Sequence, residues 1–305
     1  MHRISDLISW TYNFISYLRI YDWNRYEDTS MNRIVIKRTL TTHVKLFEVE
    51  GPAIAKKAEP GQFVVLRIDE KGERIPLTIV DSNPKEGTII LIVQEVGKTT
   101  KKLGMMKEED EIATIVGPLG NPSEIKKYGQ VVVIGGGVAI AMAYPEAKAL
   151  KEAGNKVICI IGARNKDLLF FEEEMRQVSD ELHITTDDGT KGRKGFVTDV
   201  LKELISQKKI DLVSAIGPTI MMKVVSEVTR PHEIKTFVSL NPIMLDGTGM
   251  CGVCRVTVGG ETKFACVDGP AFDGHLVDFD ELMARQKIYL EKERISMERY
   301  EKQCN

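Results

Sequence analysis

The sequence predicts a six-stranded antiparallel Greek-key β-barrel, then an α/β domain with a Rossmann-like parallel sheet, then a small cysteine-bearing hairpin and a terminal helix. Three observations predict this fold class. Short β-branched runs separated by Gly or Pro turns fill residues 31–122. Apolar runs alternate with helix-like segments over residues 123–240. Residues 241–305 contain three of the five cysteines in the pattern C-x2-C-x11-C.

The predicted barrel consists of six short runs rich in β-branched residues. These runs cover residues 34–39, 44–49, 63–68, 77–80, 88–93 and 111–116. A short helix is expected from Gly97 to Leu103, before the last strand. The preceding residues 1–30 are predicted to be an extension outside the fold; a surface-lying or partner-binding helix is the alternative.

The α/β domain is predicted from five apolar runs with helices between them. The runs cover residues 131–134, 157–161, 182–186, 212–216 and 236–240. This order is typical of a parallel sheet covered by helices on both faces. A charged helix from Phe279 to about Lys302 should end the fold, with Asp278 as its N-cap and Glu281 closing a capping box.

Composition excludes several classes of function. The chain has 305 residues, which suggests two domains, and its 43% hydrophobic and 28% charged residues are ordinary for a soluble protein. A net charge of −2 gives no basic surface, so no nucleic-acid partner is expected. The apolar stretch 7–21 is too short to span a bilayer, so no membrane partner is expected. Five cysteines without a disulfide framework fit a reducing cytosol and a cytoplasmic protein.

The cysteine-rich stretch indicates an iron–sulfur cluster. Cys251, Cys254 and Cys266 lie in a glycine-rich loop followed by a hairpin that turns at Gly259-Gly260 and returns the last cysteine to the loop. A [2Fe–2S] cluster needs four ligands, and the plant-type spacing C-x4-C-x2-C places the missing one at Asp246. The alternatives are a structural zinc site or unligated thiols, but zinc sites usually show two C-x2-C pairs or added histidines.

Nucleotide-binding signals follow the predicted parallel strands. Gly135, Gly136 and Gly137 form a strand-to-helix turn that suits a dinucleotide phosphate, although position 140 of the G-x-G-x-x-G pattern is Ile. Arg164 ends the second strand and could hold an adenosine ribose or a 2′-phosphate, which leaves NAD or NADP open. Gly217-Pro218 ends the fourth strand, and Met221 either flanks the pocket or packs its helix.

Two barrel motifs suit a phosphate-containing cofactor. Arg74, Pro76, Leu77 and Thr78 belong to R-I-P-L-T, which places a positive charge and a hydroxyl at the start of a strand. The second motif is a Gly-rich loop at a helix start, suited to a pyrophosphate. It consists of Val96, Gly97, Lys98, Thr99 and Thr100.

Taken in this order, the motifs resemble the ferredoxin–NADP reductase superfamily, in the branch of the dihydroorotate dehydrogenase electron-transfer subunit. The resemblance covers residues 31 to about 290 and rests on seven motifs. They are R-I-P-L-T, V-G-K-T-T, G-P-L-G-N, G-G-G-V-A-I-A, D-D-G-T, G-P-T-I-M-M and D-G-T-G-M-C-G-V-C. Within this branch the chain is most similar to the small (alpha) subunits of NADH-dependent reduced ferredoxin:NADP oxidoreductase, also called sulfide dehydrogenase beta subunits. Asp246 favours them, because the dihydroorotate branch has Cys there.

The resemblance implies FAD in the barrel, NAD(P)H on the α/β sheet and a [2Fe–2S] cluster near the C-terminus. It assigns Thr78 a catalytic role near flavin N5, with Arg74 and Thr99 or Thr100 on phosphate and Asp188, of D-D-G-T, at the nucleotide. NAD(P)H would give hydride to the flavin, which would pass single electrons to the cluster. The aromatic residue of the superfamily's R-x-Y-[ST] motif is missing, so Leu77 or Pro76 would pack on the isoalloxazine.

The resemblance also implies a partner, namely a larger FAD and [4Fe–4S] subunit that forms a heterodimer with this chain and binds ferredoxin. The predicted function is electron transfer in a bifurcating complex that couples NADH, NADP and ferredoxin. One alternative is the electron-transfer subunit of a dihydroorotate dehydrogenase or of a sulfide or polysulfide reductase. The other, from a different class, is a zinc-stabilised binding module without catalysis.

Overall fold

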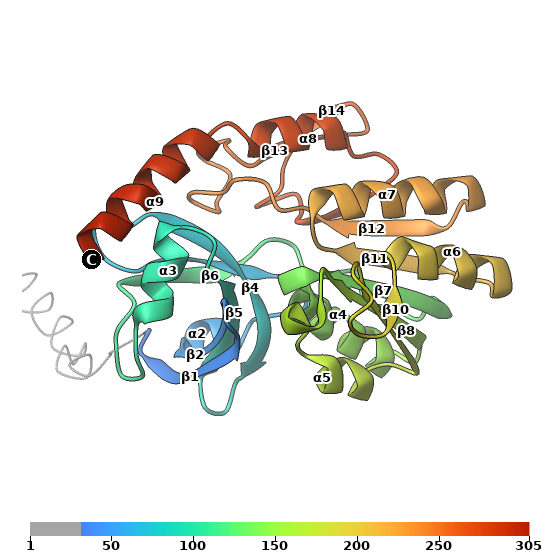
Figure 1. Cartoon of the computed structure of the whole chain (residues 1–305), viewed down its shortest axis with the longest axis horizontal. Helices are drawn as coiled ribbons and strands as arrows, with labels where there is room; N and C mark the ends of the chain where they lie inside the picture. The colour runs from blue at the N-terminus through green and yellow to red at the C-terminus, as the bar shows by residue number, and fades with distance from the viewer. Residues whose placement is uncertain (1–31, 305) are drawn as a thin grey trace, which may run out of the picture. The chain divides into compact units, whose positions relative to one another are not determined.

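The computed structural model describes residues 32–304, and their side chains as far as residue 302 (Figure 1). The predicted N-terminal extension, residues 1–30, lies outside the described residues. Among the described helices, none combines the length and the apolar character that crossing a membrane requires.

The first third of the described chain is an antiparallel sheet of six strands in the order β1-β2-β5-β4-β3-β6. The strands are β1 Ile34–Thr41, β2 Val44–Glu50, β3 Phe63–Arg67, β4 Arg74–Asn83, β5 Thr88–Gln94 and β6 Thr114–Leu119. Ile34 exchanges backbone hydrogen bonds of 2.8 to 2.9 Å with Glu109 and Asp110, so the start of β1 is bonded to the segment that leads into β6, the strand at the other edge of the sheet. This closes the predicted barrel around its buried side chains.

Three details of the barrel differ from the prediction. Strand β4 begins at Arg74 rather than at residue 77, because all of R-I-P-L-T pairs with β3. The predicted strand at 111–116 is shifted to β6, because residues 109–112 bond to the start of β1 instead. A short helix, α2 (Pro52–Ala55), was not predicted. The predicted helix after Gly97 is present as α3 (Lys98–Met105).

The second sheet has seven strands in the order β10-β9-β8-β7-β11-β12-β15. Its strands are β7 Gln130–Gly136, β8 Lys156–Ala163, β9 Glu181–Thr186, β10 Arg193–Lys194, β11 Leu212–Ile216, β12 Lys235–Ser239 and β15 Ala271–Asp273. The five predicted strands are parallel, as expected. Strand β10 and strand β15, which pairs antiparallel to β12, were not predicted.

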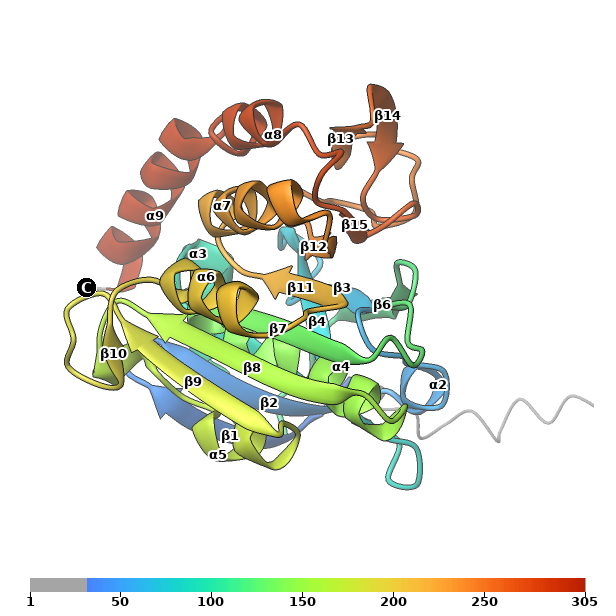
Figure 2. The same ribbon diagram turned by 90° about the vertical axis from the view of Figure 1, so that its right-hand side faces the viewer.

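Helices cover both faces of this sheet (Figures 1 and 2). They are α4 Ile140–Glu152, α5 Glu172–Gln177, α6 Val197–Gln207 and α7 Thr219–Thr229. Alternate strand residues point to opposite faces. Val132 and Ile134 of β7 therefore join α6 and α7 in one core, while Val131 and Val133 join α4 and α5 in another.

The C-terminal region contains the predicted hairpin, β13 (Arg255–Val258) and β14 (Glu261–Phe264), but two terminal helices instead of one. These are α8 (Phe279–Gln286) and α9 (Leu290–Cys304). Between them the backbone changes to tight i→i+3 bonds, such as Lys287 N–H to Ala284 at 3.2 Å. The helix breaks because α8 packs into the core of the second sheet while α9 lies along α3 of the barrel.

Asp278 caps α8 as predicted, since its carboxylate accepts the Glu281 N–H at 2.9 Å. The predicted capping box does not close. The Asp278 N–H donates to the carbonyl of Thr257 instead, and Oε2 of Glu281 is buried without a partner.

Candidate functional site

A cavity of 840 Å³ lies where the barrel meets the second sheet. Pro76, Leu77 and Thr78 line it from the middle of β4. Opposite them are the ends of three parallel strands and the turns that follow. These lining residues are Gly136, Gly137, Gly162, Ala163, Arg164, Ile216, Gly217, Pro218 and Met221. The structure therefore brings three of the predicted flavin residues, those of β4, and most of the predicted nucleotide residues together around one space.

On the barrel side, β4 connects this cavity to the Gly-rich loop. Arg74 lies exposed at the start of the strand, and four strand residues cover about 13 Å from there to Thr78. Beside Arg74, Glu73 accepts a hydrogen bond of 2.5 Å from the Thr99 hydroxyl. One extended ligand could thus contact Thr78 at one end and the Gly-rich loop at the other.

The Gly-rich loop is closed by Thr100. Its hydroxyl oxygen accepts the N–H groups of Val96 and Gly97 at 3.0 and 2.9 Å, so it shapes the start of α3. Lys98 lies in a separate groove of 370 Å³, together with Lys292 and Arg299 of α9. None of the predicted loop residues lines the large cavity.

On the other side of the large cavity, the glycine turn leaves room for a ligand. Gly137 has a φ of +61°, and apart from Gly137 and its two chain neighbours no heavy atom of the described chain lies within 4 Å of the position a Cβ would take. Gly136 and Gly217 are close-packed, because a Cβ on Gly217 would lie 3.3 Å from the Cα of Gly136. The first of the predicted glycines, Gly135, packs against α4 and does not line the cavity.

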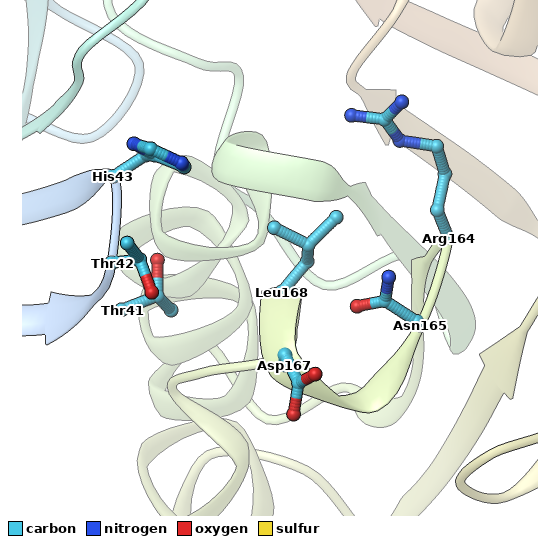
Figure 3. A pocket seen from close by; sticks show the side chains of 7 residues that line it. All are labelled: Thr41, Thr42, His43, Arg164, Asn165, Asp167 and Leu168. Carbon is cyan, nitrogen blue, oxygen red and sulfur yellow. The ribbon is translucent and has the colours of Figure 1, made fainter.

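A smaller groove of 330 Å³ adjoins the large cavity, since Arg164 and Leu168 line both. Figure 3 shows His43 of the β1–β2 turn on one side of it and Arg164 and Asn165 on the other. Oδ1 of Asn165 is buried without a hydrogen-bond partner. An orphaned acceptor in a groove suits a ligand with N–H or O–H donors, such as an adenosine.

The predicted residue Asp188 does not reach this space. Its carboxylate accepts the N–H and the hydroxyl of Thr190 at 2.9 and 2.7 Å, and these bonds lower the pKa of Asp188. Its neighbour Asp187 lines the large cavity instead.

The four predicted cluster ligands lie in one loop and the adjoining hairpin. The thiol sulfurs of Cys254 and Cys266 are 3.2 Å apart, too far for a disulfide. The Asp246 carboxylate accepts the N–H groups of Thr248 and Cys251, each at 2.8 Å. The structure therefore groups the ligands as two pairs, Asp246 with Cys251 and Cys254 with Cys266.

Electrostatics distinguish these two pairs. Burial raises the pKa of the Cys266 thiol to about 12, helped by the hydrogen bond with Cys254, while the Gly249 N–H acts in the opposite direction. The Thr248 N–H lowers the pKa of Asp246, which keeps the carboxylate charged. Among the described residues, no three His, Cys, Asp or Glu side chains converge on one metal ion. Two pairs suit a two-iron cluster, in which each iron takes two protein ligands.

The cluster loop lies close to the cavity. Met244 lines the cavity, and Asp246 follows two residues later, which limits their Cα separation to about 7 Å. A Cβ on Gly247 would lie 2.6 Å from Leu119 and 3.0 Å from Val65, so the loop rests against the barrel. A flavin in the cavity and a cluster in the loop would be near neighbours.

Sequence reasoning missed several cavity residues. Asn241 and Pro242 follow β12, where ligands of open parallel sheets bind, so this rule could have indicated them. Phe63, Phe170 and Phe196 gave no signal, because apolar residues in or beside predicted elements are normally core residues.

Comparison with known proteins identifies the family of the chain. Residues 241–278 match the family model described as the iron–sulfur cluster binding domain of dihydroorotate dehydrogenase B. The chain is 54% identical, over 89% of its length and 96% of the relative's, to a Thermotoga maritima homologue of the dihydroorotate dehydrogenase B (NAD(+)) electron transfer subunit. The corresponding subunit of Shouchella clausii is 34% identical over 73% of this chain and 88% of its own.

Solved structures give the same result. A chain in the structure of NADH-dependent reduced ferredoxin-NADP oxidoreductase, solved for insight into flavin-based electron bifurcation, is 53% identical. It has a TM-score of 0.85 and is matched over 90% of this chain and 99% of its own length. Phthalate dioxygenase reductase shares the fold alone, with 16% identity, a TM-score of 0.53, and coverage of 74% of this chain and 85% of its own.

These findings confirm the predicted fold and the flavin and iron–sulfur electron-transfer function, with FAD, NAD(P)H and a [2Fe–2S] cluster as cofactors. They decide against the zinc-stabilised binding module. As an electron-transfer subunit, the chain works with a partner subunit. The chain belongs to the family of the electron-transfer subunit of dihydroorotate dehydrogenase B.

Proposed function

We propose that this chain is the NAD(P)H-oxidising small subunit of a cytoplasmic electron-bifurcating complex that couples NADH, NADP and ferredoxin. The observation that carries the proposal is the shared cavity, which is lined both by Thr78 of the barrel and by Gly137 and Gly217 in the turns after β7 and β11. Asp246 and the similarity to the bifurcating oxidoreductase support this assignment within the family. The proposal assigns FAD to residues 31–122, the nucleotide to 123–240 and the cluster to 241–305.

FAD, when bound, converts the two-electron chemistry of a nicotinamide into single-electron transfers. The protein's part is placement. Thr78 offers a hydroxyl beside the isoalloxazine, and Pro76 and Leu77 offer an apolar surface for the ring. Arg74 and the N–H groups at the start of α3 would hold the diphosphate.

The nucleotide would extend from this cavity into the smaller groove. Gly137 leaves room for the nicotinamide end, and Gly136 and Gly217-Pro218 line the same cavity as Thr78. Arg164 and Asn165 would hold the adenosine end, because Arg164 lines both spaces and Oδ1 of Asn165 lacks a partner. Met221 packs against Gly136 and Gly217 and fixes the floor between them.

The cluster would take Asp246 and Cys251 on one iron and Cys254 and Cys266 on the other. Tetrahedral ligands with bonds of about 2.3 Å lie roughly 3.8 Å apart. The Cys254 and Cys266 sulfurs, now 3.2 Å apart, would need to separate only slightly. Cys251 is exposed, which suits electron exit toward a partner. We propose that this partner is a larger FAD and [4Fe–4S] subunit that binds ferredoxin and NADP(H).

The test is purification of the native complex under anaerobic conditions, followed by assays of NADP reduction. We expect NADP reduction to require both NADH and reduced ferredoxin, and the complex to contain a second, larger flavoprotein. If the complex instead oxidises dihydroorotate with NAD and ignores ferredoxin, the bifurcation proposal is wrong. The dihydroorotate alternative, which the Thermotoga maritima relative favours, then takes its place.

A further inference from the structure

The end of α8 contacts the cluster loop through one guanidinium group. Nη2 of Arg285 donates to the carbonyl of Val253 at 3.1 Å, in a partly buried position. Val253 precedes Cys254, so this carbonyl belongs to the peptide unit whose N–H is that of Cys254. A cation on the carbonyl polarises that peptide and makes its N–H a stronger donor.

The next residue anchors the end of α8 that carries this guanidinium. Nε2 of Gln286 donates to both the backbone carbonyl and the side-chain oxygen of Asn241, each at 3.0 Å. Oε1 of Gln286 accepts the Thr219 hydroxyl at 2.9 Å. Since Asn241 lines the cavity, α8 is anchored at the cavity wall and at the cluster loop by two consecutive residues.

Within residues 32–302, Arg285 forms no close ion pair with a carboxylate. By contrast, Arg294 on α9 pairs with both Glu291 and Glu298. A second arginine, Arg255, also donates to the loop, to Gly252 at 3.3 Å, but it is exposed to solvent.

We propose that Arg285 is a positioning residue that raises the reduction potential of the [2Fe–2S] cluster. One electron from reduced FAD adds one negative charge to the cluster, and a fixed, partly buried cation stabilises that charge. The guanidinium also holds the peptide that precedes Cys254. The inference rests on the proposed ligand set and extends it to a residue outside the loop.

The experiment is an EPR-monitored redox titration of the full-length chain with its cofactors, comparing wild type with Arg285→Gln and Arg285→Lys. We expect Arg285→Gln to lower the midpoint potential, shifting the flavin-to-cluster equilibrium threefold to tenfold toward the flavin. Tenfold corresponds to about 59 mV for one electron. Arg285→Lys keeps the positive charge, so its midpoint potential should stay close to that of wild type. The matched control, Arg255→Gln, should change the potential less, because solvent screens an exposed charge.

The inference is overturned if Arg285→Gln keeps its cluster and the wild-type potential, or if Arg255→Gln shifts the potential as much. Should Arg285→Gln lose its cluster, Gln286→Ala keeps the guanidinium but removes its anchor. A midpoint potential of Gln286→Ala equal to that of wild type would then overturn the inference, and a midpoint potential below that of wild type would support it. If the wild-type chain itself gives no [2Fe–2S] signal after reduction, the ligand set fails rather than Arg285.

Discussion

Asp246 can be a cluster ligand or simply a side chain that closes its own loop. Both carboxylate oxygens accept backbone N–H groups, which is also how an Asp stabilises a turn. Two substitutions separate these roles. Asp246→Cys supplies a ligand but no turn acceptor, whereas Asp246→Asn keeps the acceptor and loses the negative ligand.

If Asp246 is a ligand, we expect Asp246→Cys to retain the visible absorption and EPR signal of the cluster and Asp246→Asn to lose most of both. Asp268→Asn is the matched control, because Asp268 accepts the Phe264 N–H at 2.6 Å in the same region but is not a predicted ligand. If Asp246→Asn instead retains the cluster and Asp246→Cys loses it, the carboxylate only shapes the loop.

Glu146 on α4 makes the stability of the protein depend on pH. The side chain is 7% exposed and accepts hydrogen bonds from Ser123, at 3.3 Å, and from Ser214. Burial raises its pKa above the ordinary value of 4.5, which those bonds only partly offset. The neutral form therefore favours folding, and this stability is lost as pH rises from 4.5 through the raised pKa.

We expect Glu146→Gln to remove that loss. In urea unfolding experiments its stability relative to wild type should increase with pH, by at most about 1.4 kcal/mol per pH unit within this window. Glu152→Gln, an exposed carboxylate on the same helix, is the control and should show no such trend. A difference between Glu146→Gln and wild type that stays constant from pH 4.5 to pH 9 would contradict the assignment.

At the scale of elements, α8 depends on its N-cap and not on a capping box. Asp278→Ala should lower the free energy of unfolding by about 1 kcal/mol, because the Glu281 N–H loses its acceptor. Glu281→Ala should lower the free energy of unfolding much less, or even raise it, because Oε2 of Glu281 is buried without a partner. Thermal unfolding of the two variants tests this difference; equal losses would indicate a closed box.

Most elements were predictable because their signal is local. Alternation and Gly or Pro turns predicted the barrel strands, and apolar runs with helices between them predicted the five parallel strands. Arg164 and Gly217 could be predicted as cavity residues because they end such strands. Strands β10 and β15 could not, since two or three residues form strands there only through their partners. The division between α8 and α9 could not be predicted either. It arises because α8 packs on the second sheet and α9 on the barrel, and the periodicity of the sequence does not show a change of packing partner.

At the scale of the whole molecule, the segment after the last cluster ligand joins the two sheets. Its carbonyls at Gly269 and Val267 accept the backbone and side-chain N–H groups of Asn121 at the end of the barrel, at 2.6 and 3.1 Å. Pro270 accepts the Leu240 N–H at 2.9 Å, and β15 then pairs with β12. The cluster region is therefore bonded both to the barrel and to the second sheet.

Removing iron from the purified chain with a chelator should loosen this junction. Hydrogen exchange should become at least tenfold faster at Leu240, whose N–H donates to Pro270 of this segment, and at Gly274, which lies in the segment and donates to Thr236 of β12, because the cysteine loop no longer holds the segment. Amides between β7 and β8 should keep their rates, since no cysteine ligand touches them. Equal acceleration at both sets would mean that the cluster stabilises the fold as a whole and not this junction.

If the proposed ligands hold the segment that leads into strand β15, this strand gives the metal a role in maturation. It covers the outer side of β12, and an uncovered strand side is a template for pairing with another chain. The residues that supply this cover are made after all four proposed ligands. A newly synthesised chain that lacks iron would therefore present an open sheet to its neighbours, so iron supply would determine how much of the protein escapes aggregation.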